Sequence, residues 1–288
     1  LFFFFTGYQN TASQLCVSGV LSFAMAAYAL TMPACPTAPK GQKKSLSEAL
    51  GLKAFSLFKD RQMAVFFIFS MLLGVSLQIT NGFANPFIQS FGSIAEYADT
   101  WGVHNANALI SISQMSETLC ILLIPFFLRR FGIKVVMLMA MSAWVLRFGF
   151  FGLGNPGSGV WLFILSMIVY GIAFDFFNVS GSLYVDKKTT PDIRSSAQGL
   201  FMIMTNGIGA TCGTLVAQKI IDHNVFSRPA GVEQIDGWST SWLIFAGYAA
   251  VVAVLFLIIF KDRDVHPGAD RKAEAGTVGD PEGMAGNI

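Results

Sequence analysis

Three apolar stretches of the chain, each long enough to cross a membrane, contain a pair of polar side chains spaced three residues apart. The pairs are Gln78 and Asn81, Gln114 and Glu117, and Asp175 and Asn178. Residues at i and i+3 share one face of a helix. A polar group at bilayer depth is costly, about 2.5–3.5 kcal/mol for an aspartate at the helix centre, unless it faces a bundle interior or a wet cavity. The pairs therefore predict the lining of a path for a polar, hydrogen-bonding solute.

The elements that position these pairs are membrane helices. Hydrophobic residues make up 53% of the 288 positions and charged residues only 12%, about half the share of a soluble domain. Apolar runs of 18 or more residues predict spanning helices. We expect seven complete spans, at about 15–32, 62–85, 105–128, 133–153, 160–182, 195–219 and 239–260.

The basic residues are distributed unevenly between the two sides of this arrangement. Sixteen of the 19 lysines and arginines fall in the segments 40–61, 129–134, 187–194 and 261–272. Lys219 and Arg228 lie on the opposite side, and Arg147 alone lies within a span. The positive-inside rule makes the basic side cytoplasmic, together with the C-terminus. Basic residues spread over short loops give no support to nucleic-acid binding, and no CxxC or His/Cys cluster indicates a metal site or a disulfide framework.

Four regions follow from the pattern. The first residues, 1–5, look like the end of an earlier span, so we expect 1–32 to close a preceding helical half and the chain to be a fragment. A Pro- and Lys-rich cytoplasmic loop covers 33–61, and its segment 45–58 is amphipathic. Six spans follow over 62–260, and the polar tail 261–288 is expected to be disordered. A long basic loop before six helices is typical of the second half of a twelve-helix transporter.

The loop Arg129–Lys134 resembles, in degenerate form, the basic, glycine-containing turn of the major facilitator superfamily. More specific strings lie at Phe66–Gly74, Leu77–Asn81, Ser111–Leu119, Tyr170–Gly181 and Ser195–Gly199. With them, the chain from about residue 45 to 260 resembles the bacterial nucleoside:proton symporter family. The resemblance implies an all-α, polytopic membrane helix bundle, of which this chain holds the C-terminal half plus the preceding helix.

The resemblance also implies which side chains contact the substrate. They are Gln78, Asn81, Gln114, Glu117, Phe174 and Asp175. An amide has donors and an acceptor, which suits ribose hydroxyls or the edge of a base. The alternative for the amides is a contact between helices, worth about 0.6 kcal/mol. The family's contacts from its N-terminal half, a basic and a hydroxyl residue, have no counterpart in this chain.

Two carboxylates and one arginine need a separate explanation. Ionisable groups at membrane depth are functional by default. Arg147 is a possible ion-pair partner for a carboxylate, and its depth matches that of Glu117 better than that of Asp175. An aromatic ring beside Asp175 offers a stacking surface for a nucleobase, and the resemblance favours Phe174 over Phe177.

The resulting hypothesis is proton-coupled uptake of nucleosides such as uridine or adenosine by alternating access. A nucleoside is uncharged, so its accumulation needs a coupled ion, and a buried carboxylate is a natural proton carrier; Asp175 and Glu117 are the candidates. No cofactor other than the proton gradient is expected, and we expect a monomeric protein of the bacterial cytoplasmic (inner) membrane.

Two alternatives remain open from the residues alone. A sugar or another hydroxylated solute would be served equally by amides and carboxylates. A membrane enzyme or sensor is less favoured, because an intramembrane protease needs paired catalytic aspartates, a Ser/His dyad or metal-spaced histidines. None of the three His residues lies within a predicted span.

Overall fold

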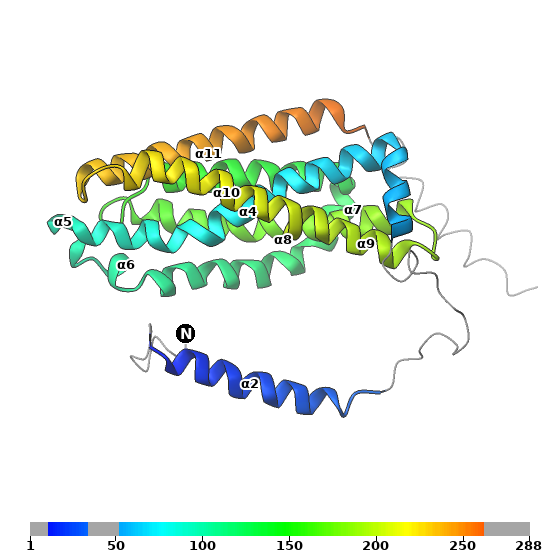
Figure 1. The fold of residues 1–288 in the computed structure, drawn as a ribbon, viewed down its shortest axis with the longest axis horizontal. Helices are drawn as coiled ribbons and strands as arrows, with labels where there is room; N and C mark the ends of the chain where they lie inside the picture. Colours follow the sequence, from blue (N-terminus) through cyan, green and yellow to red (C-terminus); the bar gives the residue numbers. More distant parts are fainter. Residues whose placement is uncertain (1–10, 34–51, 262–288) are drawn as a thin grey trace, which may run out of the picture.

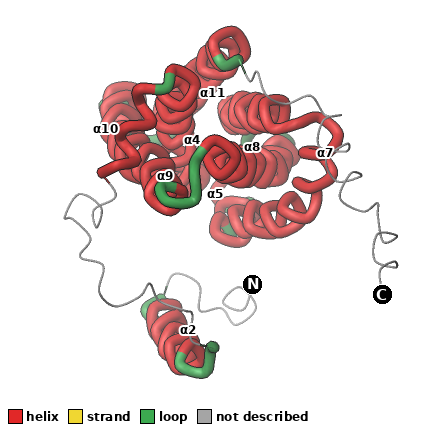
Figure 2. The backbone as a smooth tube through the Cα atoms, turned by 90° about the vertical axis from the view of Figure 1, so that its right-hand side faces the viewer, coloured by secondary structure: helices red, strands yellow, loops and turns green. Residues whose placement is uncertain are grey.

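The computed structural model describes residues 11–33 and 52–261, and over these ranges the regular structure is entirely helical (Figure 1). The long helices lie side by side in one elongated bundle, and α2 (Ser13–Ala29) stands apart from it in both views (Figures 1 and 2). No residue of α2 is buried. The expected all-α, polytopic helix bundle is confirmed.

The bundle begins after a 3-10 helix, η1 (Leu52–Lys59). Its elements, in chain order, are α4 (Arg61–Ser90), η2 (Phe91–Ser93), α5 (Ala95–Ala98), α6 (Trp101–His104), α7 (Ala106–Leu153), α8 (Val160–Lys188), α9 (Arg194–Met202), η3 (Ile203–Gly209), α10 (Ala210–Ile221), η4 (Asp222–Phe226) and α11 (Val232–Ile259). Asp60 caps α4, because its carboxylate accepts hydrogen bonds from the backbone N–H groups of Gln62 and Met63. A side chain that accepts from the first free N–H groups is the usual way to start a helix.

Within the described ranges, four helical stretches are long and apolar enough to cross a membrane: 61–93, 160–188, 194–226 and 232–259. They correspond to four of the seven expected spans. α4 continues to Ser90 and α11 already begins at Val232, beyond the expected ends at 85 and 239. The expected ends followed the apolar runs, whereas a helix continues into polar residues wherever its backbone remains hydrogen-bonded.

α7 contains two further expected spans, 105–128 and 133–153, and the turn expected between them is a sharp break in the helix. Its two arms, 106–131 and 133–153, meet at Gly132, which has a φ of 78° and breaks the helical path. A positive φ is readily available only to glycine. At about 1.5 Å per residue, each arm is longer than the roughly 30 Å hydrocarbon layer.

The span 194–226 is not a regular α-helix. It runs as α9, then a π-helical turn η3, then α10, and ends in a second π-helical turn η4. The expected span 195–219 lies within it, but the apolar pattern gave no sign of the π turns.

Packing around α8 fixes the positions of the polar residues. Ser166 donates to the backbone oxygen of Arg147 in the second arm of α7, at 3.0 Å. Ser113, in the first arm, donates to the sulfur of Met167 at 3.1 Å, and Gly171 leaves no room for a Cβ beside the Ser116 backbone. α8 is therefore held against both arms of α7.

Candidate functional site

The side chains expected at the site come from three neighbouring helices of the bundle. α4 carries Gln78 and Asn81, the first arm of α7 carries Gln114 and Glu117, and α8 carries Phe174 and Asp175. Asn81 and Gln114 are exposed and Asp175 is buried, while Gln78, Glu117 and Phe174 are half-buried. Asn178, the second member of the α8 pair, is also half-buried.

These residues lie at similar depth in the bundle. At about 1.5 Å per residue, Asp175 lies roughly 20 Å before the end of α8 at Lys188. Glu117 likewise lies roughly 20 Å before the end of the first α7 arm, on the same basic side of the bundle. Gln78 is slightly deeper, roughly 25 Å from the start of α4 at Arg61. One level of the bundle therefore holds side chains from all three helices.

Tyr170 connects two of the expected contacts, and sequence reasoning missed it. Its hydroxyl donates to the Oδ1 atom of Asn81 at 3.4 Å. Its ring stacks on Phe174, with centroids 5.9 Å apart and an interplanar angle of 4°, and Trp144 meets the same ring edge-on at 5.8 Å. Tyr170 and Phe174 are spaced i, i+4 on one helix, so this spacing was the available signal.

Arg147 packs against the Tyr170 ring. It is 1% exposed, and its guanidinium carbon lies 4.2 Å from the centroid of that ring, within the range of a cation–π contact. The guanidinium also donates to the Thr80 hydroxyl at 3.3 Å and to the Ser166 backbone oxygen at 2.7 Å. A buried charge needs such partners, because isolated burial of an ion is costly.

Glu117 is close enough to Arg147 to interact electrostatically. The two side chains do not form an ion pair within 4.0 Å, unlike Arg194 and Asp186 at the end of α8. Arg147 instead takes a hydroxyl, a backbone oxygen and aromatic faces as its partners.

Asp175 has an unusual environment for a carboxylate. It is 6% exposed, and its Oδ2 atom is buried without a hydrogen-bond partner among the described residues. Glu117 is near enough to interact with it electrostatically. Burial of a carboxylate oxygen without a hydrogen-bond partner is costly while the group is charged. The site can therefore hold a proton at this side chain.

The two phenylalanines that flank Asp175 differ in their surroundings. Phe177 is fully buried and packs against Phe66 and Phe201, with ring centroids 6.3 Å from each. Phe174 is half-buried and keeps one ring face on Tyr170. Phe174 is thus the ring with surface left for a solute, and Phe177 belongs to the core.

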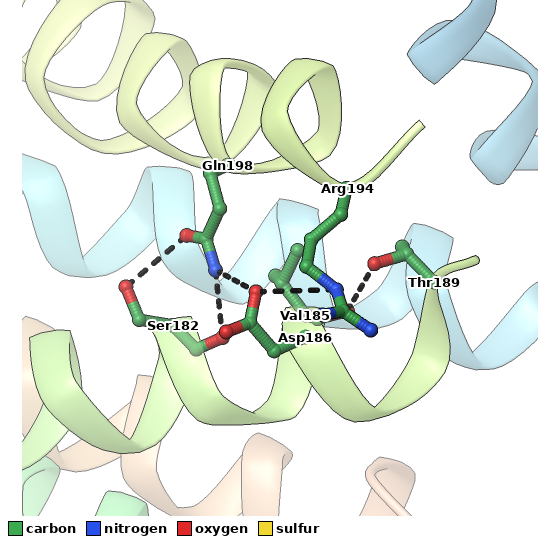
Figure 3. Close-up of polar contacts among 6 residues, drawn as sticks. All are labelled: Ser182, Val185, Asp186, Thr189, Arg194 and Gln198. Carbon is green, nitrogen blue, oxygen red and sulfur yellow. Dashed lines mark hydrogen bonds and ion pairs between the residues drawn. The ribbon is translucent and has the colours of Figure 1, made fainter. Parts of the chain in front are cut away.

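A polar cluster joins the basic ends of α8 and α9 (Figure 3). The amide nitrogen of Gln198 donates to the Ser182 backbone oxygen and to an Asp186 carboxylate oxygen, each at 2.8 Å. Arg194 adds an ion pair to Asp186 at 4.0 Å, and the Ser182 hydroxyl donates to the Gln198 side-chain oxygen at 3.1 Å. Gln198 belongs to the string Ser195–Gly199, so this string serves to fix two helices at one end.

Comparison with known proteins identifies the family of the chain. Residues 3–265 match the family model described as "Nucleoside H+ symporter". The chain is 52% identical over 254 residues to a xanthosine permease of Escherichia coli, covering 88% of this chain and 59% of the permease. It is 48% identical over 261 residues to the nucleoside permease NupG of Escherichia coli, covering 90% of this chain and 61% of that protein.

Two solved transporter structures also align with most of the chain. A crystal structure of the nucleoside transporter NupG aligns with a TM-score of 0.74 at 47% identity, over 90% of this chain and 63% of that one. A bacterial homologue of the human lysosomal transporter Spinster aligns with a TM-score of 0.51 at 15% identity, over 82% of this chain and 56% of that one, which speaks for the fold alone. The chain spans about three-fifths of the length of the curated relatives it matches. It belongs to the nucleoside H+ symporter family, with the fold of the major facilitator superfamily.

Proposed function

We propose that this chain is the substrate-binding C-terminal part of a transporter that takes up nucleosides together with protons. The observation that carries the proposal is the gathering of amides, carboxylates and one ring face at one depth of the α4, α7 and α8 helices. Asn81 and Gln114 are exposed in this bundle, although they lie in apolar helices. Polar groups at that depth are tolerated where they face a water-filled path.

In this proposal residues 62–260 form one six-helix half, and 1–32 ends the half before it. The segments 33–61 and 261–288 are the cytoplasmic loop and tail, and the C-terminus faces the cytoplasm of a bacterial inner-membrane protein. The solute lies between the two halves, which rock around it. The complete protein functions as a monomer.

Each side chain has a role that its surroundings support. Gln78, Asn81 and Gln114 hydrogen-bond the hydroxyls and base edge of the nucleoside. Phe174 stacks on the base from its free face. Asp175 carries the coupled proton, since one of its oxygens is buried without a hydrogen-bond partner, and Glu117 is the second carboxylate of the site. Neutralising the buried charge removes the electrostatic cost of closing the site.

The experiment that tests substrate class is competition for labelled uridine uptake by the full-length protein. We expect unlabelled nucleosides to compete better than free bases or glucose. Replacement of Gln78, Asn81 or Gln114 by Ala should weaken uptake without lowering the amount of protein in the membrane. Gln218→Ala is the matched control, because Gln218 is an exposed amide that hydrogen-bonds Asp222 near the far end of its helix. Competition by glucose and not by uridine or adenosine would contradict the proposal.

A further inference from the structure

The π-helical turn η3 (Ile203–Gly209) interrupts a membrane-length helix at mid-span. The Thr205 hydroxyl donates to the backbone oxygens of Phe201 and Met202, at 3.0 and 3.3 Å, and so satisfies carbonyl groups at the start of the turn. π turns are rare and are frequently found at functional sites. The extra residue in the turn changes the direction in which neighbouring side chains point.

The turn is pressed against the helix that carries two of the proposed substrate contacts. A Cβ at Gly74 of α4 would collide with the backbone oxygen of Thr205, and one at Gly209 would collide with the backbone oxygen of Met71. Gly74 lies in the first half of α4, and Gln78 and Asn81 follow it on the same helix. η3 is therefore a direct neighbour of the proposed site.

Most of the exposed side chains along this span are apolar, and Asn206 is an exception. Met202 and Ile203, one turn before it, are each 50% exposed, and Ile208 and Leu215 are 44% and 61% exposed. Asn206 is itself exposed. A polar group on an apolar membrane helix is tolerated where it faces a bundle interior or a wet cavity.

Asn206 also lies at the depth of the proposed proton carrier. The start of α9 at Arg194 and the end of α8 near Lys188 are fixed to each other by the Gln198 cluster (Figure 3). At about 1.5 Å per residue, Asn206 lies roughly 18 Å and Asp175 roughly 20 Å from that common end. The two side chains therefore belong to the same level of the bundle.

We propose that Asn206 is a further substrate-contacting residue that helps to set specificity, with its amide directed at a hydroxyl or at the base edge of the nucleoside. Among the described residues, the side-chain amide nitrogen of Asn206 contacts only the Met202 sulfur, at 3.8 Å, which is a weak acceptor. Its donors and acceptor thus remain available to a solute. The inference rests on the proposed function, because it assumes that the side of this span that carries Asn206 lines the nucleoside path.

A labelling experiment tests the position of Asn206 in the full-length protein with its native cysteines replaced. Asn206→Cys should react with a charged, membrane-impermeant thiol reagent, and bound uridine should slow the reaction. Ile208→Cys, which is exposed but lies two residues further along the turn and so on nearly the opposite side of the helix, should not react. Failure of Asn206→Cys to react, or equal reaction at both positions, would overturn the inference.

A binding experiment tests specificity. Asn206→Ala should weaken uridine binding by roughly tenfold, as expected for one lost hydrogen bond to a polar ligand, and should reduce discrimination between uridine and its 2′-deoxy analogue or between two bases. Ile208→Ala should leave uridine affinity and this discrimination unchanged. Unaltered affinity and unaltered discrimination in Asn206→Ala would reject the inference, whereas failure of the unsubstituted protein to bind uridine would instead reject the nucleoside assignment.

Discussion

At the scale of single residues, the site is built on a ring that is held from three sides. Tyr170 has the Arg147 guanidinium on one face, Phe174 stacked on it and Trp144 at its edge. Its hydroxyl orients the Oδ1 atom of Asn81, which leaves the amide N–H groups of that side chain free to donate to a solute. In the proposed site, the buried arginine would act on the solute through Tyr170 and Asn81.

Tyr170→Phe removes this hydrogen bond and keeps the ring. We expect uridine affinity to fall by about 0.5–1.5 kcal/mol, the net value of one hydrogen bond, with little change in thermal stability. Tyr248→Phe is the control, because the Tyr248 hydroxyl donates to the Leu72 backbone oxygen of the same helix α4 at 2.7 Å. Tyr248→Phe should lower thermal stability and leave uridine affinity unchanged. If Tyr170→Phe instead lowered thermal stability and left uridine affinity unchanged, Tyr170 would be only a packing residue.

Permanent neutralisation of each carboxylate should distinguish the role of Asp175 from that of Glu117. Asp175→Asn resembles the protonated side chain, so uridine counterflow should persist while accumulation driven by a pH gradient is lost. Glu117→Gln should chiefly weaken affinity. Both activities are measured in proteoliposomes containing the full-length protein. If Glu117→Gln lost accumulation and kept counterflow, the two roles would be exchanged.

At the scale of the helices, the contact between α4 and η3 is made by backbone. Gly74 and Gly209 have no space for a Cβ, and at Gly213 a Cβ would lie 2.8 Å from the Cα of Val75. Small residues allow membrane helices to approach closely, and van der Waals packing then stabilises the pair. This approach fixes the distance between the proposed contacts on α4 and those on the neighbouring span.

Gly74→Ala should therefore separate the two helices and destabilise the protein by about 1–3 kcal/mol, the usual cost of overpacking. Gly82→Ala, in the same helix, places its Cβ where nothing lies within 4 Å. It should be neutral or stabilising, since glycine costs about 0.5–1 kcal/mol relative to alanine inside a helix. Unfolding midpoints of the two purified variants provide the comparison, and equal midpoints would argue against a tight α4–η3 contact.

The helices were predictable from sequence to the extent that their signals are local. Apolar length gave the spans, and the i, i+3 spacing placed Gln114 with Glu117 and Gln78 with Asn81. The π turns were not predictable, because a shift of one residue in backbone hydrogen bonding leaves the apolar pattern unchanged. The partners of Arg147 were also missed: depth alone pointed to Glu117, whereas Thr80, Ser166 and Tyr170 lie closer through the packing of three helices.

At the scale of the whole molecule, the bundle leaves several polar residues of its spans exposed. Asn81, Gln114 and Asn206 come from three different spans, and each is exposed in this bundle. In the proposed transporter, the N-terminal half would cover these residues and enclose the solute. Alternating access then needs only a change in how the two halves meet, with the carboxylate charge neutralised while the site is closed.

The central claim is tested most directly by uridine accumulation in proteoliposomes that contain the full-length protein. An inwardly directed proton gradient should drive labelled uridine above its external concentration, and dissipating the gradient with a protonophore should abolish the accumulation. Counterflow without a gradient should continue, because exchange of a bound nucleoside requires no net proton movement. Accumulation that persists after the gradient is dissipated, or a protein that exchanges glucose and not uridine, would contradict proton-coupled nucleoside transport.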